Sequence, residues 1–444
     1  MKYFFYLNFR FFFVLREWVF RRFTLGGLMV FFGAAVSAIM GIDTGRTLCY
    51  QIFSFLSCLL LVSICVSFFF RPCLSVKRFL PEMATAGSPL RYRAAIKNLS
   101  KKKYNDLFFI EIQADPVPDF QTFLRIPEPG EEKRNFFDRA VKYYRWEWLI
   151  SMKTMAKITP HSIPPVMPGE EAVIHCEIFP QKRGVLHLSG FFIARPDFFG
   201  LFYAMKKISL PQSVVILPRR CNLPQPELEG KRQYQSGGVS LSSSVGDSEE
   251  FVSLRDYRPG DPLKRIHWKS WAKTGRPVVK EYQGEFYVRH ALILDTFEIH
   301  EYSTRFEEAV SAAASFACNM ETRESLLDLM FVGTQAYCFT TGRSLGHLDN
   351  TLKILASARP CYDKPFKSLG ALVMEKASAL SSCICILLSW DDERKTLVKN
   401  LKSMGVSVVV FLFLESNKDK FIDYGPMADT PDRFFMLVEQ ETPG

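Results

Sequence analysis

The chain has 444 residues and a formal net charge of +10, and 48% of its residues are hydrophobic. This length allows two or three domains, and the high apolar fraction, concentrated at the N-terminus, argues against an entirely soluble protein. The eleven cysteines form no C-x-x-C pair, which excludes the usual zinc-finger pattern and favours a reduced, cytosolic environment. Phosphate-binding glycine loops, the G-x-S-x-G elbow and the H-E-x-x-H pair are missing from the sequence, so an ordinary hydrolase or transferase is not favoured.

Residues 1–22 are predicted to form an amphipathic helix that lies in a membrane interface. The segment is rich in Phe and Tyr and is interrupted by Arg10 and Arg16. Such helices rest among the headgroups instead of crossing the bilayer. A cleaved signal peptide is the weaker alternative, because no A-x-A-like site follows.

Residues 23–70 are predicted to form a two-helix transmembrane hairpin. The runs 23–41 and 48–70 contain no charged residue, and each approaches or exceeds the roughly 20 residues that cross a bilayer. The connection is short, so both ends emerge on the same side. Basic residues flank the pair and only Arg46 lies in the loop: the flanking ones are Lys2, Arg10, Arg16, Arg21, Arg22, Arg71, Lys77 and Arg78. The positive-inside rule therefore places the N-terminus and the large C-terminal region in the cytoplasm.

Residues 75–225 are predicted to form a small β-sandwich. Strand-like runs alternate with turn residues at 91–99, 106–113, 171–179, 184–194 and 214–217. The stretch 130–160 does not fit this pattern, because Trp146, Trp148 and other aromatic residues lie among basic ones. These aromatic side chains either lie at the membrane interface or complete the sandwich core.

A linker is expected at 226–245, which is rich in Pro, Gly and Ser. It leads into residues 246–284, named here the signature segment. There, Phe251, Leu254 and Tyr257 recur at helical spacing, and a turn follows.

A second helix in the signature segment is predicted from Pro262 to Thr274. Asp261 is the expected N-cap and Gly275 the expected left-handed stop. A strand is expected after it, over 278–282. The interleaved charges of both signs predict a salt-bridged structural junction in preference to an open anion site.

Residues 285–444 are predicted to form an α/β doubly wound domain. Strands are expected at 288–295, 326–332, 335–340, 382–390, 406–414 and 434–438, alternating with helices at 304–320, 345–358, 367–380 and 391–404. This alternation is typical of a mostly parallel sheet. Cys383 and Cys385 alternate on one face of a buried strand and are interpreted as core residues.

The signature segment resembles the "domain of unknown function 58" family. Its acidic-Phe pair, L-R-D-Y, P-G-D, R-I-H-W-K and V-K-E-Y carry the resemblance. The residues concerned are Glu250, Phe251, Arg255, Asp256, Tyr257, Gly260, Asp261, Arg265, His267, Trp268, Lys269, Lys280 and Glu281. The resemblance implies a bacterial inner-membrane protein with a membrane hairpin, a small β domain, the signature and a domain similar to the von Willebrand factor A fold. It implies no established activity.

Domains similar to von Willebrand factor A can bind a metal ion through Asp-x-Ser-x-Ser after the first strand and a later Asp. Here Asp295 is kept, but Phe297 and Ile299 occupy the serine positions, and Asp391 or Asp392 stands where the later Asp would be. Hard cations prefer about six oxygen ligands. A degenerate site that binds neither Mg²⁺ nor Mn²⁺ is therefore predicted.

The favoured function is a cytoplasm-facing, membrane-anchored interaction or scaffold protein. The family resemblance implies a MoxR-type AAA+ ATPase as partner, in the maturation of proteins or complexes. One alternative is a divalent-cation-dependent enzyme that uses Asp295 and Asp391. Another is a module that binds anionic lipid or nucleic acid; nucleic acid is disfavoured, because acidic residues outnumber basic ones in the C-terminal domain.

Overall fold

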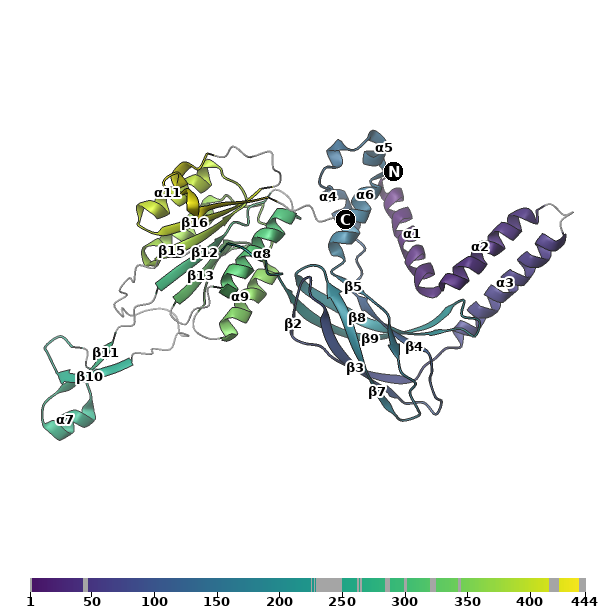
Figure 1. The fold of residues 1–444 in the computed structure, drawn as a ribbon, viewed down its shortest axis with the longest axis horizontal. Coiled ribbons are helices and arrows are strands. Elements are labelled where there is room, and N and C mark those ends of the chain that lie inside the picture. Colours follow the sequence, from purple (N-terminus) through teal and green to yellow (C-terminus); the bar gives the residue numbers. More distant parts are fainter. Residues whose placement is uncertain are drawn as a thin grey trace. The chain divides into compact units, whose positions relative to one another are not determined.

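The computed structural model describes residues 2–42, 47–224, 226, 228, 250–261, 263, 266–283, 288–298, 302–319, 325–341, 345–414 and 423–438 (Figure 1). The chain divides into two compact units. One contains residues 1–219 and 353–357, and the other contains residues 220–352 and 358–444. Apart from 226 and 228, the predicted linker lies outside the described residues.

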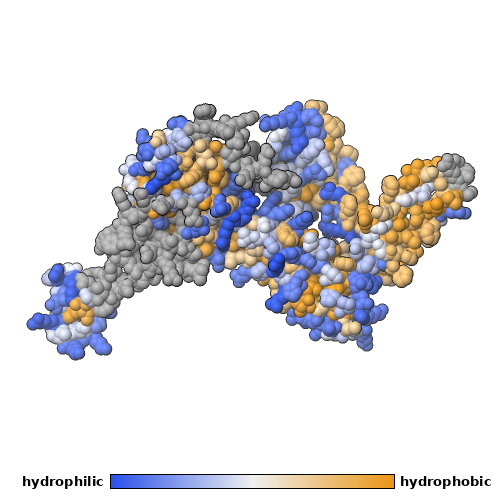
Figure 2. Space-filling view, viewed as in Figure 1, coloured by the Kyte–Doolittle hydropathy of each residue, from blue (hydrophilic) through white to orange (hydrophobic). Residues whose placement is uncertain are grey.

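The first unit begins with three helices. They are α1 (Lys2–Arg22), α2 (Leu25–Met40) and α3 (Thr47–Phe68). Apolar side chains cover α2 and α3, which lie side by side (Figure 1, Figure 2). The segment Leu48–Phe68 is long and apolar enough to cross a membrane, whereas α2, with 16 residues, is shorter than the predicted run and than a typical span.

Two sheets enclose the next core, with strand orders β1-β3-β7-β5 and β2-β9-β8-β4-β6. The strands are β1 (Leu74–Phe79), β2 (Met83–Thr85), β3 (Leu90–Asn98), β4 (Leu107–Gln113), β5 (Ala156–Ile158), β6 (His161–Ile163), β7 (Glu171–Pro180), β8 (Gly184–Pro196) and β9 (Tyr203–Leu217). Alternate side chains of β3 and β7 enter the core between the sheets. Strand β9 is far longer than the predicted 214–217, because it pairs with β8 along its whole length.

Residues 120–153 contain three short helices, α4 (Phe120–Arg125), α5 (Phe136–Val141) and α6 (Tyr143–Lys153). Phe123, Trp146 and Leu149 pack against Tyr6 of α1 in a cluster separate from the sandwich core. The prediction that the aromatic residues complete the sandwich core is therefore wrong for Trp146. Phe136 and Phe137 are exposed, and their location at a membrane interface stays a prediction.

The signature segment folds as a two-stranded antiparallel sheet with a helix between its strands. The elements are β10 (Glu250–Asp256), α7 (Trp268–Thr274) and β11 (Val278–Gln283). The helix predicted over 251–257 is wrong, because pairing with β11 holds these residues extended, with a register shift after Phe251.

Helix α7 begins at Trp268, not at Pro262, because the chain before it is tied to β11. Ile266 forms a β-bridge with Val279, and the His267 N–H donates to the Val278 carbonyl at 2.8 Å. The predicted stop is confirmed, since Gly275 has a left-handed φ of 67°.

The second unit also contains a six-stranded sheet with the order β14-β13-β12-β15-β16-β17. Its elements are β12 (Val288–Leu294), α8 (Thr304–Asn319), β13 (Ser325–Val332), β14 (Ala336–Thr341), α9 (Leu345–Ser357), α10 (Lys367–Lys376), β15 (Ser382–Leu387), α11 (Asp392–Ser403), β16 (Ser407–Leu414) and β17 (Phe434–Val438). Among these pairs β14 runs antiparallel to β13 and the others are parallel, in agreement with the predicted mostly parallel sheet.

Helices pack on both faces of this sheet. Apolar residues of α10 and α11 bury one face together with Cys383 and Cys385, which are fully buried as predicted. On the other face Phe316 of α8 packs against Phe411 of β16, with ring centroids 4.7 Å apart. Polar side chains after β12 and β15 lie at the carboxyl end of the sheet, where the first candidate site is found.

Candidate functional site

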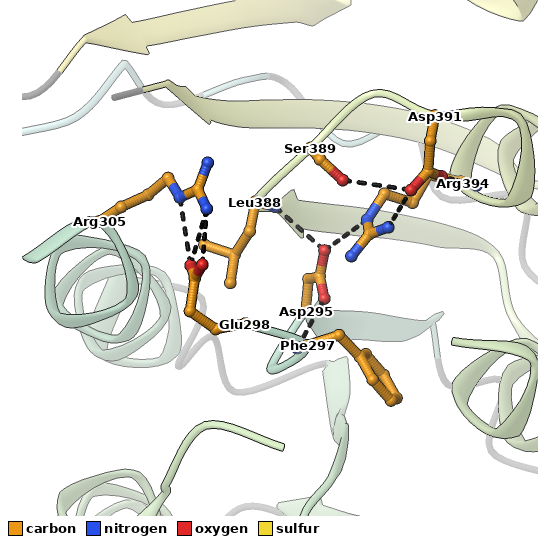
Figure 3. Close-up of polar contacts among 8 residues, drawn as sticks. All are labelled: Asp295, Phe297, Glu298, Arg305, Leu388, Ser389, Asp391 and Arg394. Carbon is orange, nitrogen blue, oxygen red and sulfur yellow. Dashed lines mark hydrogen bonds and ion pairs between the residues drawn. The ribbon is translucent and has the colours of Figure 1, made fainter. Parts of the chain in front are cut away.

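Asp295 directly follows β12, which lies between β13 and β15 in the sheet. The strand order reverses there, and α/β proteins place ligand sites at the carboxyl ends of strands at such a reversal. The carboxylate is fully buried. Its Oδ1 accepts the Phe297 N–H at 3.0 Å and its Oδ2 accepts the Leu388 N–H at 3.1 Å (Figure 3).

Arg394 joins the two carboxylates that the sequence predicted would converge. Its Nε donates to Oδ2 of Asp295 at 2.6 Å, and its Nη1 donates to Asp391 (Figure 3). Asp391 is also the N-cap of α11, where it accepts the Arg394 N–H at 3.0 Å. The guanidinium lies 4.4 Å from the centroid of the Phe366 ring. A protein cation therefore stands between the carboxylates.

Burial raises the pKa of Asp295, and the charge and hydrogen bonds of Arg394 oppose this rise. Burial alone would lower the pKa of Arg394, but the carboxylates of Asp295 and Asp391 raise this pKa above its usual value. We take the pair as ionised, because Asp295 accepts three N–H donors, one of them from a guanidinium.

Two further oxygen-bearing side chains after Asp295, those of Thr296 and Glu298, are engaged elsewhere. The Thr296 hydroxyl donates to the Val332 carbonyl at 2.5 Å. Glu298 is buried and pairs with Arg305, whose Nη2 lies 2.8 Å from Oε1 (Figure 3). Phe297 packs against Phe366, with ring centroids 5.5 Å apart. Ile299 lies outside the described residues.

Arg394 is the residue that sequence reasoning missed. The sequence feature that could have revealed its role is the Asp391-x-x-Arg394 spacing, because residues three apart at the start of a helix lie on the same side. Within the described residues, no group of three or more His, Cys, Asp or Glu side chains is placed to hold a metal ion.

The second candidate site is the sheet and helix of the signature segment. The helix cap predicted for Asp261 would involve residues 262, 264 and 265, which lie outside the described residues. The Asp261 carboxylate pairs with Arg255 through two hydrogen bonds of 2.7 and 2.8 Å and accepts the Arg258 N–H at 2.8 Å. The Arg255 guanidinium, together with that N–H, lowers the pKa of Asp261 to about 2. The pair closes the turn after β10, as a salt-bridged junction would.

Helix α7 presents an aromatic and basic surface. The indoles of Trp268 and Trp271 stack with centroids 5.2 Å apart, and 62% of Trp268 is exposed. Lys269 and Lys273 are also exposed. Beneath this surface, Ile266 and Val279 are buried, and the His267 ring lies 2.6 Å from the Ser270 hydroxyl, so His267 is packed and hydrogen-bonded.

The remaining signature residues are described in part. Asp256 is exposed on β10, Tyr257 donates its N–H to the Pro277 carbonyl, and Lys280 is half-buried on β11. Gly260 lies in the turn before Asp261. Arg265 lies outside the described residues, as do the side chains of Glu250, Phe251 and Glu281.

Comparisons with known proteins cover part of the chain. The family model "Protein of unknown function DUF58" matches residues 253–379, which include most of the signature segment and Asp295 but end before Asp391. The uncharacterized protein YeaD of Bacillus subtilis (strain 168) is 25% identical over 178 residues. That alignment covers 40% of this chain and 43% of YeaD.

Two solved structures show a weak likeness to this chain. The CARDB domain of the PF1109 protein from Pyrococcus furiosus has a TM-score of 0.18 at 13% identity, covering 33% of this chain and 93% of that one. A beta-glucosidase from Listeria innocua has a TM-score of 0.15 at 11% identity, covering 31% of this chain and 16% of the other. At these scores the likeness informs neither fold nor function.

Proposed function

We propose that the protein is a membrane-anchored, cytoplasm-facing interaction protein whose signature segment binds a protein partner. The apolar helices α2 and α3 would act as a transmembrane hairpin in a bacterial inner membrane. The observation that carries the partner site is the pair of stacked tryptophans on α7, in which Trp268 is exposed and Trp271 is half-buried. Tryptophans are the residues that most often dominate the binding energy of protein interfaces.

The partner class that the DUF58 resemblance implies is a MoxR-type AAA+ ATPase, with a role in maturing other proteins or complexes. The described side chains of the signature segment support a recognition role: Leu254, Leu263 and Trp268 are exposed, and exposed apolar side chains are typical of interaction surfaces. Lys269 and Lys273 on the same helix would add electrostatic steering toward an acidic partner surface.

The test is co-purification of the full-length protein in detergent with a MoxR-type ATPase from the same organism. Trp271→Ala and Lys269→Ala should abolish retention while leaving the melting temperature nearly unchanged. Tyr362→Ala is the matched control, because Tyr362 is an exposed aromatic residue of the α/β domain. If the native protein retains no such ATPase in any nucleotide state, the proposal fails.

We also propose that the α/β domain is similar to the von Willebrand factor A fold and works without a resident divalent cation. Strand order and the position of Asp295 support the first part. Arg394 supports the second, since its guanidinium contacts both carboxylates and supplies the positive charge that a metal ion would bring.

The rival function is a divalent-cation-dependent enzyme at Asp295 and Asp391. For this enzyme, Mg²⁺ or Mn²⁺ would have to displace Arg394, and millimolar metal should then raise the melting temperature. An unchanged melting curve removes the rival, whereas a metal-dependent rise would overturn the proposal of a metal-free domain.

A further inference from the structure

The turn between β8 and β9 carries two exposed phenylalanines. Phe198 is 93% exposed and Phe199 is 48% exposed. Two adjacent aromatic rings in water are unfavourable, and aromatic residues at this density are characteristic of interaction surfaces.

The turn is held rigid by Asp197. Its Oδ1 accepts the N–H groups of Leu201 and Phe202 at 2.7 and 2.8 Å, and its Oδ2 accepts that of Phe199 at 3.3 Å. The carboxylate is buried beneath the turn. These backbone donors are therefore satisfied internally, which removes the main cost of placing a turn in an apolar medium.

The same turn is fixed to the first residues of helix α2. The Thr24 hydroxyl donates to the Gly200 carbonyl at 2.6 Å, and the Thr24 N–H donates to the Leu201 carbonyl at 3.1 Å. The approach is close enough that a Cβ on Gly27 would lie 2.0 Å from the Leu201 oxygen. Phe198 and Phe199 thus lie beside the start of an apolar helix.

The end of the other apolar helix meets the same end of the sandwich. Phe70, just after α3, is buried in the sandwich core, and the Arg195 guanidinium lies 4.9 Å from its ring centroid. The turn end of strands β8 and β9 therefore lies beside the first residues of α2 and the last residues of α3. In membrane proteins this level is the interface, where aromatic side chains concentrate.

We propose that Phe198 and Phe199 insert into the lipid surface beside α2, so that the sandwich is seated on the membrane and not merely tethered to it. This inference rests on the proposed anchoring by α2 and α3. The exposed Lys206 and Lys207 of β9 and the half-buried Arg22 at the end of α1 would contact anionic headgroups around the inserted turn.

The test uses the full-length protein in phosphatidylcholine and phosphatidylglycerol liposomes. Phe198→Trp adds a fluorophore at the turn. Its emission is obtained by subtracting the spectrum of the native protein, which has six tryptophans. Lipids brominated in the upper acyl chain should quench the added emission, which should be shifted to the blue. Phe199→Trp provides a second reading of the same turn.

Phe179→Trp is the matched control. Phe179 is an exposed aromatic residue of β7, next to the turn that leads into the other end of β8. Strand β8 has 13 residues, so this end lies on the order of 40 Å from Pro196. The emission added by this variant should resist quenching.

An alkaline wash followed by flotation reports anchoring separately. In one outcome, the protein stays with the liposomes while the added emission of both turn variants is quenched no more than that of Phe179→Trp. That result would overturn the insertion of the turn but not the anchoring by α2 and α3. Protein that washes off overturns the anchoring by α2 and α3, and the inference with it.

Discussion

At the residue scale, the guanidinium of Arg394 stabilises the negative charge of the fully buried Asp295. Asp295 has no access to water, so its charge depends on the guanidinium and on two backbone N–H groups. Glu298 is held in the same way by Arg305, one loop further along the chain. Removing one partner of a buried pair costs more than the pair itself contributes, because the remaining charge is left without compensation.

We predict that Arg394→Met destabilises the α/β domain by roughly 3–5 kcal/mol, because it leaves Asp295 buried and unpaired. Adding Asp295→Asn should recover part of the loss, since the buried charge is then removed. Lys395→Met is the matched control: Lys395 pairs with an exposed Asp423, and its loss should cost roughly 0–1 kcal/mol. Denaturant melts of the full-length protein measure all three, and equal costs for the two methionine variants would contradict the buried-pair explanation.

A pH dependence follows from Asp261. Its pKa is lowered from 3.8 to about 2 by Arg255 and by the Arg258 N–H, so the folded state holds the proton more weakly than the unfolded chain. The resulting stabilisation is complete above about pH 4 and is lost as the pH falls towards 2. In Asp261→Asn the stability should therefore fall less over this interval than in the native protein. Denaturant midpoints between pH 5 and pH 2 measure it, with Asp256→Asn as the control; parallel slopes for Asp261→Asn and the native protein would refute the pairing.

At the scale of elements, the signature segment shows how pairing overrides local preference. Phe251, Leu254 and Tyr257 have helical spacing, yet the chain before Asp256 is a strand because β11 supplies its hydrogen-bond partners. The same strand shortens α7, since residues 266 and 267 are bonded to it. Seven helical residues then end at a glycine with positive φ.

We predict that Gly275→Ala destabilises this segment by about 1 kcal/mol, because a Cβ disfavours the left-handed conformation. Gly370→Ala is the matched control within α10, where a Cβ would meet no atom within 4 Å. That change should stabilise the protein by about 0.5–1 kcal/mol through the lower entropy of the unfolded chain. Thermal melts of both variants measure the effects, and a stabilising Gly275→Ala would show that the left-handed stop is absent in solution.

At the scale of the whole molecule, the distribution of charge around the apolar helices determines the expected topology. Basic residues precede α2 and follow α3, and one arginine lies between the helices. The β-sandwich and the α/β domain both follow the second apolar helix in the chain, so they should share one side of the membrane.

A protease added to intact spheroplasts should leave the C-terminal domain whole, and the same protease should remove it from inverted membrane vesicles. The physical reason is the positive-inside rule, which retains basic flanks in the cytoplasm. Immunoblotting against a C-terminal tag measures the outcome. Loss of the domain in intact spheroplasts would reverse the orientation and remove the argument for a reduced environment around the cysteines.

Local sequence patterns determined much of the second unit. Strands read from apolar runs, such as 382–390 and 406–414, and the Ala-rich helix at 304–320 are present within a few residues of the predicted ranges. The reason is that period and propensity act over short stretches, and a sheet buried on both faces leaves a continuous apolar signal. The position of Asp295 at the end of the first strand follows from the same pattern.

Only the tertiary structure decided which charges meet. Arg394 lies 99 positions from Asp295, and Arg78 of β1 meets Glu111 of β4 in the buried core of the other unit. Likewise, the Phe198 turn reaches Thr24 across 176 positions through Gly200. Strand order and the packing of whole elements determine which charged residues become partners. The local periodicity of the sequence carries no information about either. The sequence therefore determined the elements and the apolar helices, whereas packing determined the cation between the carboxylates and the aromatic turn beside α2.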